Sequence, residues 1–308
     1  MSKLITAYKI FKNNKRLFLV ALFTNINKKG LLNWLCDKSF LKLMYRIHFG
    51  KELNLLSPKS FNEKLQWLKL YDRKPLYCKL VDKYEVKQYI ANKIGEEYVI
   101  PTLGVWNSIE EIDWQGLPNQ FVIKCTHDSG SVVVCKNKSE LDIDAVCKKL
   151  EKCLKQNMYY WGREWVYRDV KPRIIAEKFM KDDKPELTDY KFMCFNGKVK
   201  CTFLCTNRFS EGGLRVTFYD TDWNKMPFER QHPSEKEPAP RPKCYDEMVA
   251  LSEKLATGIS FVRVDFYEIE GRPYFGEMTF FPGDGTEVFT PEEWDYKLGK
   301  WIVLPPKA

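Results

Sequence analysis

Four polar residues near the carboxyl end of the chain have types and spacing suited to phosphate chemistry. Arg263 and Asp265 lie two positions apart in one alternating run, residues 261–269, and Glu277 and Thr279 lie two positions apart in the next. Alternate side chains of a strand lie on one face of a sheet. Two carboxylates and a hydroxyl suit Mg²⁺, which takes one or two carboxylates and completes its shell with water and nucleotide phosphates. An arginine beside them would offset charge on a transferred phosphoryl group.

The turn between the two runs decides whether these side chains meet. The Glu-Gly pair at residues 270–271 is a hairpin signal, and we expect a three-residue turn from Ile269 to Gly271, with the glycine in the left-handed position. That turn pairs Arg263 with Glu277 and puts all four side chains on one face. A two-residue turn would place Asp265 and Glu277 on opposite faces and remove the argument. The alternative interpretation is a solvated strand face with an Arg–Glu cross-strand pair.

A loop of small residues lies earlier in the chain. Residues 126–131, Thr-His-Asp-Ser-Gly-Ser, separate two strand-like runs, and small residues let backbone N–H groups approach phosphate oxygens. Lys124 would add a point charge. His127 is a candidate base or phosphate ligand. An ordinary hairpin with a loop histidine in polar contacts explains the same pattern.

The elements that must position these residues follow from hydrophobic periodicity. Apolar residues recur at three and four positions between residues 5 and 71, which predicts helices, and Ser60 with Glu63 is a helix start. Further helices are expected at residues 81–94 and 141–156, the second capped by Ser139 or Asp142. Strands are expected at residues 121–125, 132–135, 174–179, 190–195, 199–206, 214–219 and, as a hairpin, 261–281. Strands and helices interleave without a strict β-α-β rhythm, so the predicted class is α+β, or mixed α/β.

Composition and charge narrow the class of protein. The 308 residues are 44% hydrophobic, which is enough for a sizeable core, and the ten cysteines are scattered singly, as in a reduced, cytoplasmic protein. No run is long enough to span a membrane. Residues 1–50 hold ten Lys/Arg against one acid, Asp37. This basic, Leu- and Phe-rich segment is either a helix packed on the main domain or a contact with an anionic membrane surface; no nucleic-acid recognition motif is present.

The order of these segments along the chain, from Asp82-Lys83 to the run Glu277-Met-Thr-Phe-Phe-Pro-Gly283, resembles that of the ATP-grasp superfamily. Specifically, they resemble the TupA-like ATP-grasp group of bacterial surface-polysaccharide clusters. The resemblance covers roughly residues 58–303. It implies an ATP-grasp domain at 81–308, with a lid part at about 100–180 and a metal-binding part at about 181–308. Residues 1–80 read as a basic helical region in place of the small Rossmann-like domain of most relatives.

The resemblance also implies roles for individual residues. The phosphate contacts would be Lys83, Lys124 and Lys191, and the lid loop would be Ser129, Gly130 and Ser131. Ile175-Ala-Glu177-Lys178-Phe-Met180 matches the strand whose backbone reads adenine, and Asp183 or Glu186 would meet the ribose; a buried strand with surface Glu177 and Lys178 is the alternative. The metal acids would be Asp265 and Glu277, with Thr279 where many relatives have asparagine and Arg263 as the phosphate-stabilising arginine.

The chemistry that this family implies is ATP- and Mg²⁺-dependent ligation of a carboxylate to an amine through an acyl phosphate. The acceptor would be a small or lipid-linked sugar acid of a surface-polysaccharide precursor, and the protein would lie in the cytoplasm or peripherally on the inner face of the membrane. The aromatic run 158–167 would stack on sugar rings, or else it packs in the core. Two rivals remain: a glycosyltransferase using Asp142-Ile-Asp144 or Asp220-Thr-Asp222, and a non-catalytic membrane-associated binding module.

Overall fold

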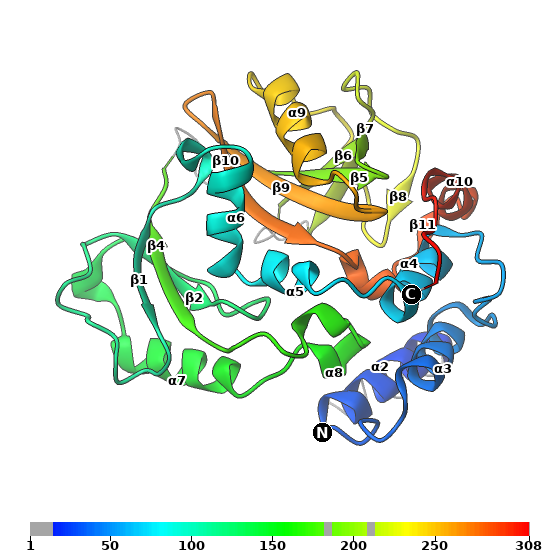
Figure 1. The fold of residues 1–308 in the computed structure, drawn as a ribbon, viewed down its shortest axis with the longest axis horizontal. Coiled ribbons are helices and arrows are strands. Elements are labelled where there is room, and N and C mark those ends of the chain that lie inside the picture. Colours follow the sequence, from blue (N-terminus) through cyan, green and yellow to red (C-terminus); the bar gives the residue numbers. More distant parts are fainter. Residues whose placement is uncertain (1–14, 182–186, 208–212, 308) are drawn as a thin grey trace.

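The chain is built from two antiparallel sheets with helices around them (Figure 1). The computed structural model describes residues 15–181, 187–207 and 213–307. Among these residues, strands and helices alternate irregularly and neighbouring strands pair antiparallel. The predicted α+β, or mixed α/β, class is therefore confirmed.

The smaller sheet lies within residues 102–178 and has the order β1-β4-β2-β3. Its strands are β1 (Thr102–Trp106), β2 (Phe121–Cys125), β3 (Val133–Cys135) and β4 (Ile174–Lys178). Helix α7 (Ile143–Leu154) covers one face, where Val146 and Leu150 join a core with Phe121, Ile123 and Ile174. The α7 cap is Asp142, whose Oδ1 accepts from the Ala145 N–H at 2.9 Å. The other predicted cap lies in a short 3₁₀ helix, η2 (Lys138–Glu140).

The larger sheet has the order β10-β9-β5-β6-β7 and contains the hairpin residues predicted from the sequence as site candidates. Its strands are β5 (Asp189–Phe195), β6 (Lys198–Thr206), β7 (Arg215–Tyr219), β9 (Phe261–Ile269) and β10 (Arg272–Thr279). Helix α9 (Tyr245–Leu255) packs on this sheet (Figure 1). Two short strands, β8 (Glu229–Arg230) and β11 (Phe289–Thr290), pair separately beside helix α10 (Glu293–Trp301).

From residue 15 onward, helices precede the first strand, as periodicity predicted; residues 5–14 of that prediction lie outside the described part of the chain. They are α2 (Lys15–Lys28), α3 (Asp37–Phe49), α4 (Phe61–Tyr71), α5 (Leu76–Val81) and α6 (Glu85–Lys93), followed by a 3₁₀ turn, η1 (Glu96–Tyr98). The capping box of Ser60 and Glu63 is confirmed at the start of α4. The single helix expected at 81–94 was wrong in part, because the Asp82 carboxylate accepts from the N–H groups of Tyr84 and Glu85 and so interrupts it.

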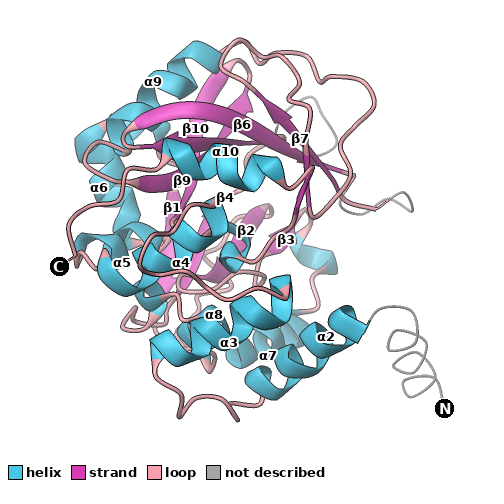
Figure 2. Cartoon of the chain, turned by 90° about the vertical axis from the view of Figure 1, so that its right-hand side faces the viewer, coloured by secondary structure: helices cyan, strands magenta, loops and turns pink. Residues whose placement is uncertain are grey.

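One core joins these helices to the large sheet. The ring of Phe61 in α4 lies 5.0 Å from that of Phe261 in β9 and 5.9 Å from that of Phe289 in β11, both edge-to-face. Helix α2 contacts a short helix α8 (Tyr159–Gly162), where Asn27 Nδ2 donates to the carbonyls of Tyr160 at 3.0 Å and Trp161 at 2.8 Å. Figure 2 shows α2, α3 and α8 grouped at the end away from the large sheet.

Helix α4 also has a buried polar face, which is unusual in a helix that packs on a core. Asn62, Gln66 and Lys69 recur at helical spacing and are 1%, 1% and 0% exposed. They donate to carbonyl groups of the loop after β10, which contains a 3₁₀ turn η4 (Pro282–Gly285): Asn62 to Glu287, Gln66 to Asp284 and Gly285, and Lys69 to Asp284. The helix therefore anchors the segment that directly follows the metal-binding candidates.

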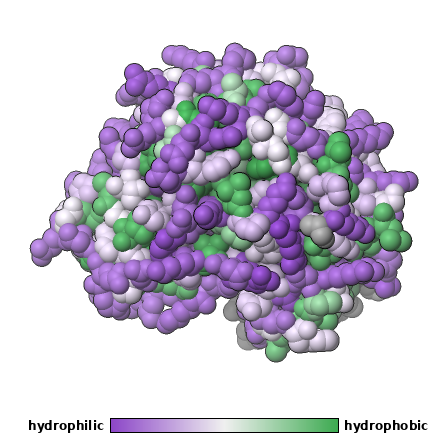
Figure 3. Space-filling model, in the orientation of Figure 1, coloured by the Kyte–Doolittle hydropathy of each residue, from purple (hydrophilic) through white to green (hydrophobic). Residues whose placement is uncertain are grey.

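The surface in Figure 3 is largely hydrophilic with scattered apolar residues. Within the described part of the chain, no helix is both long and apolar enough to cross a membrane.

Candidate functional site

The turn between β9 and β10 differs from the prediction. It has two residues, Glu270 and Gly271, both with positive φ, 52° and 76°, and Ile269 pairs with Arg272. Positive φ at both central residues is the type of turn that matches the twist of a hairpin. The three-residue turn was therefore wrong, and Arg263 pairs with Thr279 instead of Glu277.

A bulge at Gly276 restores the face that the shorter turn would have lost. The register runs from Arg272 to Phe275, shifts at Gly276, and then pairs Glu277 with Asp265. One extra residue changes the parity of every later side chain on that strand. A Cβ at Gly276 would lie only 3.1 Å from the Asp265 carbonyl oxygen, so the strands approach each other closely here. The expected face is thus present through a feature that the turn argument did not include.

An ionic network occupies this face. The Arg263 guanidinium grips Asp265 with two hydrogen bonds of 2.7 Å and reaches Glu277 Oε1 at 2.6 Å. From the neighbouring strand β5, Lys191 Nζ lies 2.5 Å from Asp265 Oδ2 and also pairs with Asp189. Asp265 is 1% exposed, whereas the Glu277 side chain is 44% exposed. The buried Asp265 carboxylate contacts both cations, and the Glu277 carboxylate is the one that reaches solvent.

These contacts separate the ionisation of the two carboxyl groups. Burial raises the pKa of Asp265 to about 6, although Arg263 and Lys191 oppose the shift. Burial works against ionisation of Glu277 too, but Arg263, followed by Lys191 and the lysines at positions 83 and 124, lowers the pKa of that carboxyl to about 2. Although burial disfavours its charged form, Asp265 and Asp189 raise the pKa of Lys191. Glu277 is therefore an anion at all physiological pH values.

The donor set fits Mg²⁺. No group of three His, Cys, Asp or Glu side chains arranged for a metal occurs among the described residues, so a site built wholly from protein ligands is not present there. Mg²⁺ keeps waters and binds phosphates through one or two carboxylates. Glu277 offers an exposed carboxylate, Asp265 has further lone pairs on its bonded oxygens, and the Thr279 hydroxyl lies 3.4 Å from Glu277 Oε1.

Lysines from the other part of the chain lie opposite the hairpin. Lys83 follows α5; its N–H donates to the Thr126 carbonyl at 3.1 Å and its ammonium donates to the Asp128 carbonyl. Burial lowers the pKa of Lys83, while the charge of Glu277 raises it and that of Lys124 lowers it further. The predicted phosphate lysines are therefore close to one another and to the metal face.

Glu177 of β4 is the centre of a second buried ionic group. It is 6% exposed, so the surface interpretation was wrong for this residue. Its two oxygens pair with Lys124 at 2.5 Å and Lys87 at 2.6 Å. Burial opposes its ionisation, but the two lysines lower the pKa of Glu177. Lys87 was not among the predicted site residues, because a lysine on a helix carries no distinctive pattern.

The loop from 126 to 131 divides into an exposed tip and a buried base. Ser129 and Gly130 are exposed, and a Cβ at Gly130 would meet nothing within 4 Å. Ser131 is buried; its hydroxyl donates to Asp128 Oδ1 at 2.6 Å and accepts from the Cys125 N–H. His127 is 2% exposed, and its Nε2 lies 3.1 Å from the Gln156 carbonyl. Burial lowers the pKa of His127.

The predicted adenine strand ends at Lys178, whose side chain is exposed and whose N–H donates to the Pro101 carbonyl at 2.9 Å. Met180 follows, half-buried. The ribose candidates Asp183 and Glu186 lie outside the described residues.

Other sequence candidates lie away from the hairpin face or in different roles. Asp142 and Asp144 lie at the start of α7, and Asp220 accepts from the N–H groups of Asp222 and Asn224, which makes that segment a turn, as expected. In the aromatic run, Trp165 is 6% exposed, whereas Tyr160 and Trp161 are each 39% exposed.

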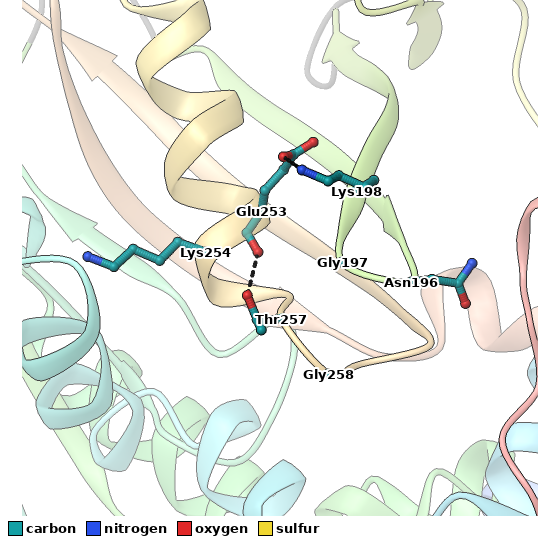
Figure 4. Close-up of a pocket in the computed structure, with 7 residues that line it drawn as sticks. All are labelled: Asn196, Gly197, Lys198, Glu253, Lys254, Thr257 and Gly258. Atoms are coloured by element: carbon teal, nitrogen blue, oxygen red, sulfur yellow. Dashed lines mark hydrogen bonds and ion pairs between the residues drawn. The ribbon is translucent and has the colours of Figure 1, made fainter.

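An open pocket of about 370 Å³ lies at the carboxyl end of α9 (Figure 4). Lys198 pairs there with Glu253, and the Thr257 hydroxyl donates to the Glu253 carbonyl at 3.1 Å. None of the sequence-predicted site residues lines it. Its carboxylate already has a cationic partner, so this pocket offers no comparable chemistry.

Comparison with known proteins gives a family match and distant structural similarity. A family model described as TupA-like ATP-grasp matches residues 63–303. No curated protein matches the chain. One similar solved structure is D-alanine–D-alanine ligase from Bacillus anthracis complexed with ATP, with 17% sequence identity, a TM-score of 0.39, and coverage of 66% of this chain and 56% of that chain. Another is L-amino acid ligase from Bacillus licheniformis, with 12% sequence identity, a TM-score of 0.41, and coverage of 76% of this chain and 51% of that chain. The chain thus spans little more than half of either protein, and similarity at these TM-scores is too low to transfer details of a site.

Proposed function

Because the chain belongs to the TupA-like ATP-grasp family, we propose that it is an ATP- and Mg²⁺-dependent ligase that joins a carboxylate to an amine. The observation that carries this proposal is the hairpin face, where Arg263, Asp265 and Glu277 meet Lys191 from the adjacent strand. A partly exposed anion, two cations held by Asp265 and nearby lysines suit phosphoryl transfer, since catalysis there is mostly positioning and charge stabilisation.

Each residue has a proposed part in this reaction. Asp265, Glu277 and Thr279 would hold Mg²⁺, which supplies charge to the β- and γ-phosphates when bound. Lys83 and Lys124 would bind phosphate oxygens, and for Lys124 this means leaving or sharing its contact with Glu177. Glu177 and the backbone at 178–180 would hold the adenine.

Arg263 and Lys191 would stabilise the charge on the phosphoryl group during its transfer, because the carboxylates that they contact keep both side chains protonated inside the protein. The exposed tip Ser129-Gly130, with the anchored Ser131, would cover the phosphates and exclude water. His127 would reach the phosphates only if it gave up its contact with the Gln156 carbonyl. Of the predicted residues, it therefore has the weakest case for a catalytic role.

In the proposed sequence, the acceptor carboxylate attacks the γ-phosphorus and ADP leaves. The resulting acyl phosphate is attacked by the amine, phosphate leaves, and an amide remains. As the carboxylate we propose a sugar acid of a surface-polysaccharide precursor, small or lipid-linked. The half-exposed rings of Tyr160 and Trp161 are suitable for stacking on a sugar.

We place the protein in the cytoplasm and, through its basic amino-terminal region, on the inner membrane face. All ten cysteines are unpaired, which suits a reducing compartment. Between α2 and α3, Leu31 is 60% and Trp34 is 79% exposed. Apolar side chains beside basic helices favour an anionic lipid surface. Cosedimentation with anionic vesicles, lost on Trp34→Ala or in neutral vesicles, would support this; equal recovery in all pellets would refute it.

No geometric observation favours a glycosyltransferase. Of its two Asp-x-Asp candidates, one starts a helix and the other uses Asp220 to close a turn.

Calorimetric titration with a non-hydrolysable ATP analogue, with and without Mg²⁺, tests the proposal directly. We expect binding that needs both Mg²⁺ and Asp265, so Asp265→Asn should abolish it. Asp222→Asn is the matched control, since it removes an exposed carboxylate from a turn. Absence of binding by the wild-type protein, or binding unaffected by Mg²⁺ and by Asp265→Asn, would return the chain to the binding-module interpretation.

A further inference from the structure

A second set of charged residues borders the end of the metal-binding hairpin. Beyond β10, Phe280 stacks on Tyr77 at 4.3 Å between ring centroids, and Tyr77 lies 6.2 Å from Trp165. Residues 162–167 thus run beside the end of the hairpin. They begin at the last residue of α8 and include the 3₁₀ turn η3 (Trp165–Tyr167).

The contact between these two segments is close and polar. A Cβ on Gly162 would fall 1.8 Å from Asp284 Oδ1, so the Asp284 carboxylate rests directly against the Gly162 backbone. Lys69, 0% exposed, ties the two together: it donates to the Gly162 carbonyl at 2.9 Å and forms an ion pair with Asp284. The charge of Lys69 is therefore already balanced by Asp284.

Glu164 remains without such a balance. It lies two residues beyond Gly162, it is half-buried, and no hydrogen bond or ion pair to its carboxylate is found within the described residues. A half-buried carboxylate without a partner loses solvation that a hydrogen-bond donor or a cation would replace.

The electrostatic surroundings of this segment connect it to the proposed reaction centre. Burial, followed by Asp284, raises the pKa of Glu164 to about 8, while Lys69 and Arg263 oppose the shift. Three residues later, burial raises the pKa of Tyr167, and the charges of Glu164, Glu277 and Asp128 add to that. The segment is therefore within reach of the hairpin face and of the loop opposite it.

We propose that Glu164 is a catalytic residue that receives the amine substrate. The proposal rests on the ligase function above. A cationic amine would dock against the Glu164 carboxylate, with the partly exposed Asp284 beside it. The docked cation first gives one proton to the Glu164 carboxylate, which leaves a neutral nitrogen with a lone pair. As that nitrogen attacks the acyl carbon, the C–N bond forms and the bond from carbon to the phosphate oxygen breaks. Phosphate leaves with the electron pair and takes up the second proton that the nitrogen loses.

The charges around Glu164 favour an amine over an anionic ligand. The two cations that act on Glu164, Lys69 and Arg263, are already paired with carboxylates. An acceptor carboxylate would therefore face Glu164 and Asp284 without a free cation from the described residues. An amine instead gains the charge-assisted hydrogen bond that Glu164 lacks. A carboxyl group whose pKa lies near the working pH is also well matched to proton transfer from an amine.

Saturation-transfer NMR on the full chain loaded with Mg²⁺ and a non-hydrolysable ATP analogue tests the assignment. The probes are methylamine, ethanolamine and glycinamide, with acetate as the anionic counterpart. We expect saturation transfer to at least one amine and none to acetate. Glu164→Gln should weaken amine binding by about tenfold or more, as expected for one charge-assisted hydrogen bond. Glu164→Asp keeps the charge and should restore part of the binding.

The matched control is Glu151→Gln, an exposed glutamate on α7, which should leave amine binding unchanged. Melting temperatures of all variants exclude loss of fold. No transfer to any amine, or equal transfer to wild type and Glu164→Gln, overturns the assignment. If the analogue itself does not bind, the ligase proposal fails instead, and the same titration on the nucleotide-free protein still decides whether Glu164 holds an amine.

Discussion

Substitutions of the two hairpin carboxylates should both reduce nucleotide binding, but only that of Asp265 should also reduce the stability of the fold. Asp265 is 1% exposed and its oxygens accept from Arg263, twice at 2.7 Å, and from Lys191 at 2.5 Å. Removing one partner of a buried ion pair costs about 3–5 kcal/mol, because the opposite charges stay buried without compensation. For a chain of this length that corresponds to a fall of about 5–8 °C in melting temperature. Asp265→Asn should therefore lose both stability and Mg²⁺-dependent nucleotide binding.

Glu277→Gln should lose the binding and keep the stability. The Glu277 side chain is 44% exposed, and solvent screening reduces an exposed pair to about 1 kcal/mol or less. Calorimetric denaturation and analogue titration on both variants give the comparison, with Asp222→Asn as the control. A melting temperature that falls equally in both variants would contradict the assignment of a buried, cation-holding acid and an outer, ligand-facing acid. Unchanged affinity for the analogue with Mg²⁺ in Glu277→Gln would refute the metal site itself.

Three further results are expected. Because the pKa of Glu164 is raised from its usual value to about 8 in the folded chain, its ionisation costs stability as pH rises from about 4.5 to 8; Glu164→Gln should match wild type in urea denaturation at pH 5 and exceed it at pH 8, and parallel curves would contradict this. Gly276→Ala should weaken binding of the ATP analogue by shifting the bulge, since the new Cβ would lie 3.1 Å from the Asp265 carbonyl oxygen. Unchanged affinity would show that the two strands move apart without disturbing the site. Lys87→Met should lower the free energy of unfolding by about 3 kcal/mol, because buried Glu177 then keeps one cationic partner instead of two. Urea denaturation should show no such loss for Lys148→Met, which removes an exposed lysine.

Family and fold class were predictable because their signals are local and ordered along the chain. The resemblance expected over residues 58–303 is confirmed by the match over 63–303, and with it the prediction of an ATP-grasp enzyme at the level of family. The capping box at Ser60 and the cap at Asp142 rest on three-residue spacings, which sequence shows directly. The predicted division at residue 80 and the individual site roles stay predictions.

The hairpin shows where parity reasoning from a turn is incomplete. The expected three-residue turn was wrong, yet Asp265 and Glu277 share a face, because the bulge at Gly276 adds the residue that the turn lacks. A glycine inside a strand pattern is itself a bulge signal, so the correct register was within reach of the sequence. Lys87 and Glu164 had no such signal. Their partners or neighbours, Glu177 and Asp284, lie 90 and 120 residues away in the chain, and only the tertiary structure brings them together.

The buried polar face of α4 has a consequence for any attempt to isolate the catalytic part of the protein. Asn62, Gln66 and Lys69 provide the donors for the carbonyl groups of the loop that begins at Pro282. A fragment starting at residue 81 would leave those acceptors without partners and would strip Phe61 from its ring contacts in the large sheet. Such a fragment should be recovered as aggregate, and adding a synthetic peptide of residues 58–80 should rescue part of it, as in split-protein complementation.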